Sequence, residues 1–243
     1  MKYIRRALLV ATFVGALPGA VALAWAADAT PDWSGLWLGA MQGGFGVEVN
    51  AYYKSGAKIE LPPYKPEYLE KYKHNLDLLH AGQTILGRTC KPPGTPGNMI
   101  APVPIEFIIQ PNRVTILTEW GNETRRIWTD GRPLPNYIRS TLVGTSRGHW
   151  EGDSLVVKTV GLRGPELELD SSAPPFSEQL TVTERIRLVS PDRLENIVTL
   201  NDPVALLKPW TKKLAYHKVK GSQDIYEYSC WEDEDEFKKA NLK

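Results

Sequence analysis

A glutamate that stands alone on an apolar strand face is the first residue whose setting indicates chemistry. Along residues 179–189 the alternate positions carry Leu, Val, Glu, Ile and Leu, and the glutamate among them is Glu184. Alternate residues of a β-strand face the same side of a sheet. A carboxylate buried on such a face has its pKa raised by desolvation, which suits a general acid or base. The alternative is a brace for a nearby arginine, because buried charges are usually paired.

A pair of adjacent arginines supplies the candidate for holding an anionic group. Arg125 and Arg126 follow each other in a predicted strand, so their side chains must point to opposite faces. Only one of them can face the interior, where its planar guanidinium could bind a carboxylate or phenolate through two hydrogen bonds. We take Arg126 as the catalytic candidate, although the residues themselves leave the choice open. In the alternative, both arginines lie outside or brace Glu119 and Glu184.

His149 is the histidine with the best case for proton transfer, because an imidazole titrates near neutral pH. The strand pairing expected for it, however, places it on one face with Arg147, Glu151 and Lys158, which is typical of a solvated surface. Both interpretations stay open. The histidines lack the spacing of a metal-binding motif, and the sequence has no Gly-x-Ser-x-Gly nucleophile motif. We therefore expect neither a metal nor another cofactor.

Aromatic side chains in or beside the predicted strands could form the walls of a binding site. A flat apolar ligand is well held by such walls together with a few polar groups. Asp130 has a competing explanation, because the Thr-Asp-Gly-Arg sequence around it could serve only a turn. The residues expected to contact a small hydrophobic or aromatic partner are Trp120, Trp128, Trp150, Trp210, Glu119, Asn122 and Asp130.

The strands that must position these residues are organised around a predicted hairpin over residues 141–162. Its turn is Gly152-Asp153, a pair of the type that closes a two-residue turn. This register places Trp150 opposite Leu155. Other runs with a period of two predict strands over residues 32–37, 106–110, 114–119, 123–128, 179–189, 193–200 and 210–219.

One amphipathic helix is predicted over residues 67–80, where apolar side chains recur at intervals of three and four. Pro66 fits its first turn. A succession of short strands with a single helix indicates a mostly β fold. We expect an antiparallel β-barrel that is closed on itself, with this helix as its plug or cover.

The N-terminus has the pattern of a secretory signal peptide. Residues 1–26 combine early basic residues, an apolar stretch rich in small residues and a final Ala-Trp-Ala. An uncleaved anchor is the alternative, although the apolar stretch is short for a membrane span. We expect one mature domain over residues 27–243, periplasmic or secreted, without stable membrane insertion. In that compartment Cys90 and Cys230 are expected to form a disulfide, with two buried thiols as the alternative.

The composition restricts the classes of partner. A chain of 243 residues with 42% hydrophobic and 23% charged residues fits a single globular domain. Its formal net charge of +1 gives no broad attraction to nucleic acid or anionic lipid. We therefore expect no nucleic-acid partner. The oligomeric state stays open, a homo-oligomer included.

Several segments resemble a mostly uncharacterised family of secreted bacterial β-barrel proteins. The most specific segment is GHWEGD at residues 148–153, followed by LVV. The resemblance extends over LPPYKPEYLEKY, EFIIQPNRVTILTEWGNETRRIWTDGRPLP, SEQLTVTERIRLVSPDRLE and LNDPVALLKPW. It implies a lipocalin-like barrel and brings no established active site.

The functional expectation rests on analogy with proteins of similar fold in similar bacteria. Some such barrels in bacteria that degrade aromatic compounds resemble cofactor-free lyases and decarboxylases of lignin-derived phenolics. We therefore expect a cofactor-independent lyase, of the decarboxylase or formaldehyde-releasing type, that acts on a bulky aromatic substrate. The alternative is a carrier that binds the same kind of ligand without chemistry.

Overall fold

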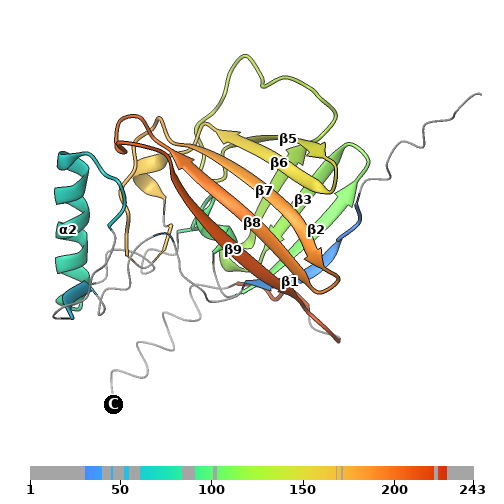
Figure 1. Ribbon diagram of the computed structural model, residues 1–243, viewed down its shortest axis with the longest axis horizontal. Coiled ribbons are helices and arrows are strands. Elements are labelled where there is room, and N and C mark those ends of the chain that lie inside the picture. The colour runs from blue at the N-terminus through green and yellow to red at the C-terminus, as the bar shows by residue number, and fades with distance from the viewer. Residues whose placement is uncertain are drawn as a thin grey trace, which may run out of the picture.

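The fold is a closed barrel of β-strands, seen in a computed structural model of the chain (Figure 1). The structure describes residues 31–39, 45, 52–54, 61–83, 91–100, 103–167, 169–170, 172–221 and 224–228. The strands of this part are β1 (Gly35–Gly39), β2 (Pro104–Gln110), β3 (Arg113–Thr118), β4 (Glu123–Trp128), β5 (Thr145–Glu151), β6 (Ser154–Val160), β7 (Thr181–Ser190), β8 (Arg193–Asn201) and β9 (Trp210–Lys218). The predicted mostly β, closed architecture is confirmed.

The central hairpin forms as its sequence predicts. β5 and β6 pair antiparallel with Trp150 opposite Leu155, and Gly152 in the connecting turn has a φ of 60°. This left-handed conformation suits glycine because it has no Cβ. The alternation of β7 is also as expected: Val182, Glu184 and Ile186 are buried between more exposed neighbours.

One strand pairing differs from the expected antiparallel barrel. β4 and β5 are parallel, with Ile127 opposite Ser146 and Trp128 opposite Arg147. Parallel neighbours need a connection that returns the chain to the end from which the first strand started. Residues 129–144 make this return as a loop that stands away from the barrel (Figure 1). The expectation of an entirely antiparallel barrel is therefore wrong at this pairing.

Buried apolar side chains line the inward faces of the strands, and aromatic packing closes the end at which β1 begins. Trp33 is 1% exposed and meets Phe107 edge-on, with ring centroids 5.0 Å apart. It also meets Trp150 at 5.9 Å. Edge-to-face pairs of this kind add to the stabilisation from apolar burial.

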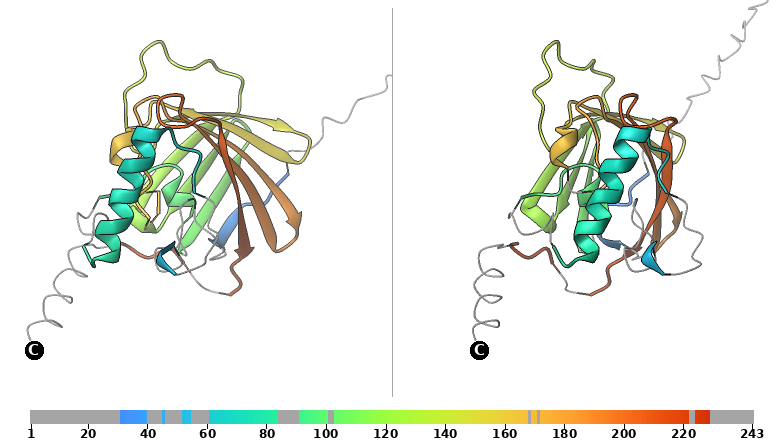
Figure 2. Two further views of the ribbon diagram at one scale, coloured as in Figure 1. Left: turned by 60° about the vertical axis from the view of Figure 1, so that its left-hand side comes forward. Right: turned by 90° about the vertical axis from the view of Figure 1, so that its left-hand side faces the viewer.

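Helix α2 (Pro66–His80) lies across the opposite end of the barrel, as the right-hand view of Figure 2 shows. Its buried face is Tyr68, Tyr72 and Leu76, at the spacing of four that an amphipathic helix requires. Just before the helix, Tyr64 forms a β-bridge with Leu206 in the loop between β8 and β9. The expected covering helix is confirmed.

Several expectations concern residues outside the described part of the chain. The predicted signal peptide over residues 1–26 lies there, as do Cys90 and Cys230. Among the helices that the structure does describe, none has the length and apolar character of a membrane span.

Candidate functional site

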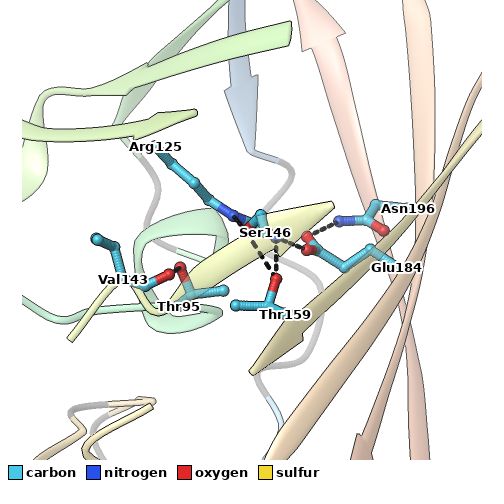
Figure 3. Close-up of polar contacts among 7 residues, drawn as sticks. All are labelled: Thr95, Arg125, Val143, Ser146, Thr159, Glu184 and Asn196. Carbon is cyan, nitrogen blue, oxygen red and sulfur yellow. Dashed lines mark hydrogen bonds and ion pairs between the residues drawn. The ribbon is translucent and has the colours of Figure 1, made fainter. Parts of the chain in front are cut away.

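Five polar side chains meet inside the barrel and form the interior polar cluster: Arg125, Ser146, Thr159, Glu184 and Asn196 (Figure 3). Each comes from a different strand, in order from β4 to β8. None is more than 3% exposed. The alternation of each strand places one polar residue among apolar neighbours on the inward face, so the cluster follows from the register.

Arg125 is the hub of this cluster. Its Nε donates to Ser146 Oγ at 3.0 Å, and its Nη2 donates to Thr159 Oγ1 at 2.8 Å and to Glu184 Oε2. On the other side of the carboxylate, Asn196 Nδ2 donates to Glu184 Oε1 at 3.1 Å. Both oxygens of Glu184 are therefore engaged by donors from the wall of the barrel.

The ion pair at the centre is shielded from water, since Arg125 is 2% exposed and Glu184 0%. Removing one partner of such a pair leaves an uncompensated buried charge. The hydrogen bonding of the cluster is nevertheless incomplete, because Arg125 Nη1 and Asn196 Oδ1 have no partner among the described residues. Buried polar atoms without partners are uncommon in native proteins and call for an explanation.

A second carboxylate, that of Glu123, points inward from the same strand two residues before Arg125. Desolvation by burial raises its pKa to about 7. The Gly94 N–H, which donates to Glu123 Oε2 at 3.1 Å, opposes this shift, as do the nearby Asn98 amide and the Arg125 charge. The Asn98 amide lies close enough to influence the carboxyl but outside the geometry of a hydrogen bond. Glu123 is therefore a buried acid that titrates near neutral pH.

Residues 91–99, which we call the closing loop, cover Glu123. Thr95 anchors the loop through its N–H to Leu142 O at 3.0 Å and its hydroxyl to Val143 O at 3.3 Å. Gly94 has a φ of 73° and lies tightly against Leu142 and Leu167. Most of the loop is buried. Glu123 thus lies between the closing loop and the interior polar cluster.

Tyr216 connects the same two features from β9. Its hydroxyl donates to Met99 O in the closing loop at 2.8 Å, and the side chain is 0% exposed. Burial and then the charge of Glu184 raise its pKa. Tyr216 therefore remains a neutral phenol at physiological pH, where it acts as a hydrogen-bond donor rather than a base.

Of the three catalytic candidates from sequence, Glu184 alone lies in the cluster. The inward arginine is Arg125, whereas Arg126 is exposed on the outer face of β4, away from the cluster. His149 is exposed on the outer face of β5, where its Nε2 lies 2.9 Å from Glu151 Oε1. Both residues occupy positions whose strand alternation turns them away from the interior.

Glu119 and Asn122 hold a segment of the chain near its C-terminus. Glu119 Oε2 accepts a hydrogen bond from the Tyr226 N–H at 3.0 Å. The Asn122 amide accepts from the Tyr228 N–H at 3.1 Å and donates to Tyr228 O at 2.8 Å. Their described contacts are thus with the backbone of residues 226–228, at the turn between β3 and β4.

Asp130 and Trp128 belong to a surface arrangement around Arg132. Asp130 binds the Arg132 guanidinium at 2.6 Å, and this guanidinium lies 3.7 Å from the centre of the Trp128 ring. Stacking of arginine on an aromatic face is favourable at such distances. Trp120 is half-buried in the 3₁₀ turn η2 (Trp120–Asn122). These three residues lie outside the interior polar cluster.

Trp150 and Trp210, the other two tryptophans expected to contact a ligand, face the interior at opposite ends of the barrel. Trp150 packs on Trp33 at the closed end. Trp210 is 8% exposed at the end covered by α2, where it meets Phe45 at 5.2 Å and Tyr64 at 6.4 Å. Aromatic walls therefore lie above and below the interior polar cluster.

The described residues contain no group of three or more His, Cys, Asp and Glu side chains that could hold a metal ion. Comparisons with protein-family models and with curated proteins give no match for this chain.

Proposed function

We propose that this protein binds a bulky aromatic molecule, of the lignin-derived phenolic type, in a lipocalin-like barrel and acts on it as a cofactor-independent lyase. The observation that carries the proposal is Glu123, a buried acid whose pKa is about 7 beside an arginine with an unused donor. General acids and bases work best when their pKa lies near the working pH. A strongly perturbed carboxyl in an enclosed site is a candidate for function.

In this proposal the proton carrier is Glu123 rather than Glu184. Glu184 accepts hydrogen bonds from Arg125 and Asn196 with both oxygens, so we assign it the role of a positioning residue. Arg125 then offers its free Nη1 to an oxygen of the substrate. A buried, preoriented donor of this kind stabilises negative charge that develops during a reaction.

The barrel suits a single small ligand. Barrels with about eight strands enclose side chains or one small molecule. The closing loop is fixed by a few hydrogen bonds, in which Thr95 and the Gly94 N–H donate and Met99 O accepts from Tyr216. Its release would open a path to Glu123. We also propose that the protein works in the periplasm or outside the cell, on the pattern of its first 26 residues.

A carrier without chemistry is the second candidate. It is favoured by the complete engagement of the Glu184 carboxylate, because an acid held by Arg125 and Asn196 has no free position for a substrate proton. A carrier, however, has no need of Glu123 with a raised pKa. The two candidates therefore differ in what they require of Glu123.

The test is a substrate-depletion screen by mass spectrometry, with purified protein and a panel of phenolic dimers and monomers. The Glu123→Gln variant keeps the shape of the side chain and removes its titrating proton. We expect its turnover to fall about a hundredfold or more, the usual scale of general acid–base help, while ligand binding persists. Glu67→Gln, on the exposed side of α2, is the control and should keep full activity. Binding without product in the wild type would establish the carrier instead.

A further inference from the structure

Lys212 is a cation on the inward face of β9. It is paired in register with Val198, which is 0% exposed inside the barrel. Its neighbours at alternate positions, Trp210 and Leu214, are both buried, whereas Lys212 itself is half-buried. The alternation of β9 therefore turns the Lys212 side chain toward the interior. Lys212 follows Trp210, which lies at the end covered by α2, by two residues.

Lys212 has no ion-pair or hydrogen-bond partner among the described residues. Its neighbour Lys213 points outward, is 62% exposed and pairs with Glu195 at 3.2 Å. An ordinary half-buried lysine would lay its stem on apolar surface and place its ammonium in water. The inward position and the missing acid partner together make Lys212 available to a ligand.

The interior polar cluster, by contrast, has no spare positive charge among the described residues. The guanidinium of Arg125 is already compensated by the buried Glu184 carboxylate. Glu123 adds further negative charge whenever it is ionised. A ligand carboxylate placed against this cluster would be uncompensated, and buried charges without partners are strongly disfavoured. The unused Nη1 of Arg125 instead fits an uncharged acceptor, such as a hydroxyl, ether or carbonyl oxygen.

The backbone positions of Glu184 and Lys212 are separated by about the length of a small aromatic molecule. Glu184 is opposite Val198, and Val198 is opposite Lys212, so the two backbone positions are separated by two strand spacings. Adjacent strands are about 4.8 Å apart, which places these positions roughly 10 Å from each other. That is the scale of a single aromatic ring with a short side chain.

We propose that Lys212 is a specificity residue that holds the anionic group of an aromatic ligand near the covered end, while an uncharged oxygen of the same ligand reaches Arg125. This inference rests on the proposed function and narrows its substrate class to aromatic acids whose acid group binds Lys212.

The test compares two probes that share a ring and a propenyl chain, ferulate with a terminal carboxylate and coniferyl alcohol with a terminal hydroxyl. Dissociation constants are measured by calorimetry at pH 7.5 on the wild type, Lys212→Met and Lys213→Met. We expect Lys212→Met to weaken ferulate binding about tenfold, the scale of one hydrogen bond to a charged group. Coniferyl alcohol should bind within about twofold of the wild type, by the same scale, and Lys213→Met should change neither probe.

Two outcomes would overturn the inference alone: unchanged ferulate binding in Lys212→Met, or an equal loss for both probes. Equal loss would mean that the substitution damages the barrel rather than removing a contact to the anion. If neither probe binds the wild type, the proposed aromatic ligand class fails first, and the assignment of Lys212 falls with it. Thermal unfolding of each variant accompanies the titrations, so that a folding defect is recognised.

Discussion

Glu123 and Arg125 point into the barrel from the same strand, two residues apart, yet their carboxyl and guanidinium groups have different partners. Arg125 binds Glu184 across the interior, and Glu123 accepts a hydrogen bond from the Gly94 N–H in the closing loop. The arginine is thus committed to one acid while the other remains near its protonation midpoint at neutral pH. This division gives one carboxylate a structural role and leaves the other free to exchange a proton.

The raised pKa of Glu123 makes stability depend on pH. Between pH 4.5 and about 7 the folded state retains a proton that the unfolded chain has released, so the free energy of unfolding falls as pH rises through this window. The total effect is on the order of 3 kcal/mol. Glu123→Gln should match the wild type near pH 4 and exceed its stability at pH 8. Denaturant titrations at four pH values measure this, and parallel curves for the two proteins would contradict it.

Removal of the Glu184 carboxylate should lower the free energy of unfolding. Glu184→Gln leaves Arg125 as an unpaired charge inside the barrel, so we expect a loss of about 3 to 5 kcal/mol. The matched control is Glu151→Gln, which breaks the surface pair of Glu151 with Arg185. Exposed pairs contribute little, so this variant should unfold at nearly the wild-type temperature. A Glu184→Gln variant as stable as the control would remove the role of positioning residue from Glu184.

The fit of the closing loop can be tested at a glycine. Gly94→Ala would place a Cβ 2.6 Å from Leu167 Cδ2 and 2.7 Å from Leu142 O, at a φ of 73°. Gly131→Ala has nearly the same φ, 74°, with nothing within 4 Å. The control, Gly131→Ala, should lose about 1 kcal/mol of stability from its backbone conformation alone. Gly94→Ala should lose clearly more, because its Cβ also meets Leu142 and Leu167. Thermal melts of both variants give the comparison. An equal loss of stability would show that the closing loop shifts to accommodate the added methyl group at little cost.

The disulfide between Cys90 and Cys230 stays a prediction, because both cysteines lie outside the described residues. A Cβ at Gly121 would lie 3.1 Å from Pro92, and Asn122 binds the backbone of Tyr228. Segments that lead toward both cysteines therefore meet at one turn. Alkylation of the protein purified without reductant should add no label, whereas alkylation after reduction should add two. Labelling of both thiols without reductant would rule out the bond.

The sequence predicts the β5–β6 hairpin and its register because alternation and the Gly152-Asp153 turn agree. It finds Glu184 for the same reason, since one carboxylate among apolar residues has a single reasonable face. The parallel pairing of β4 and β5 escapes prediction because alternation is the same for parallel and antiparallel neighbours. Residues 129–144 carry turn signals at their start and so resemble a simple reversal.

Glu123 is missed for a different reason. It begins a strand in which acidic, hydroxyl and basic residues follow one another, a composition typical of a surface. Its burial comes from the closing loop, which lies far away in the sequence and has no regular period of its own. The inward choice between Arg125 and Arg126 likewise depends on register across the barrel, which one strand cannot reveal.

The pairing of β1 with β9 joins the first and the last of the described strands. Trp37 lies opposite Lys218, so the last gap in the wall closes only when residues 210–218 pair with β1. Before this pairing forms, the sheet is open and has unpaired edges, which are templates for association with other chains. Contacts between segments so distant in sequence also slow folding, into the range of milliseconds to seconds for such topologies. Closure of the barrel therefore removes the two edges at which this sheet could pair with another chain.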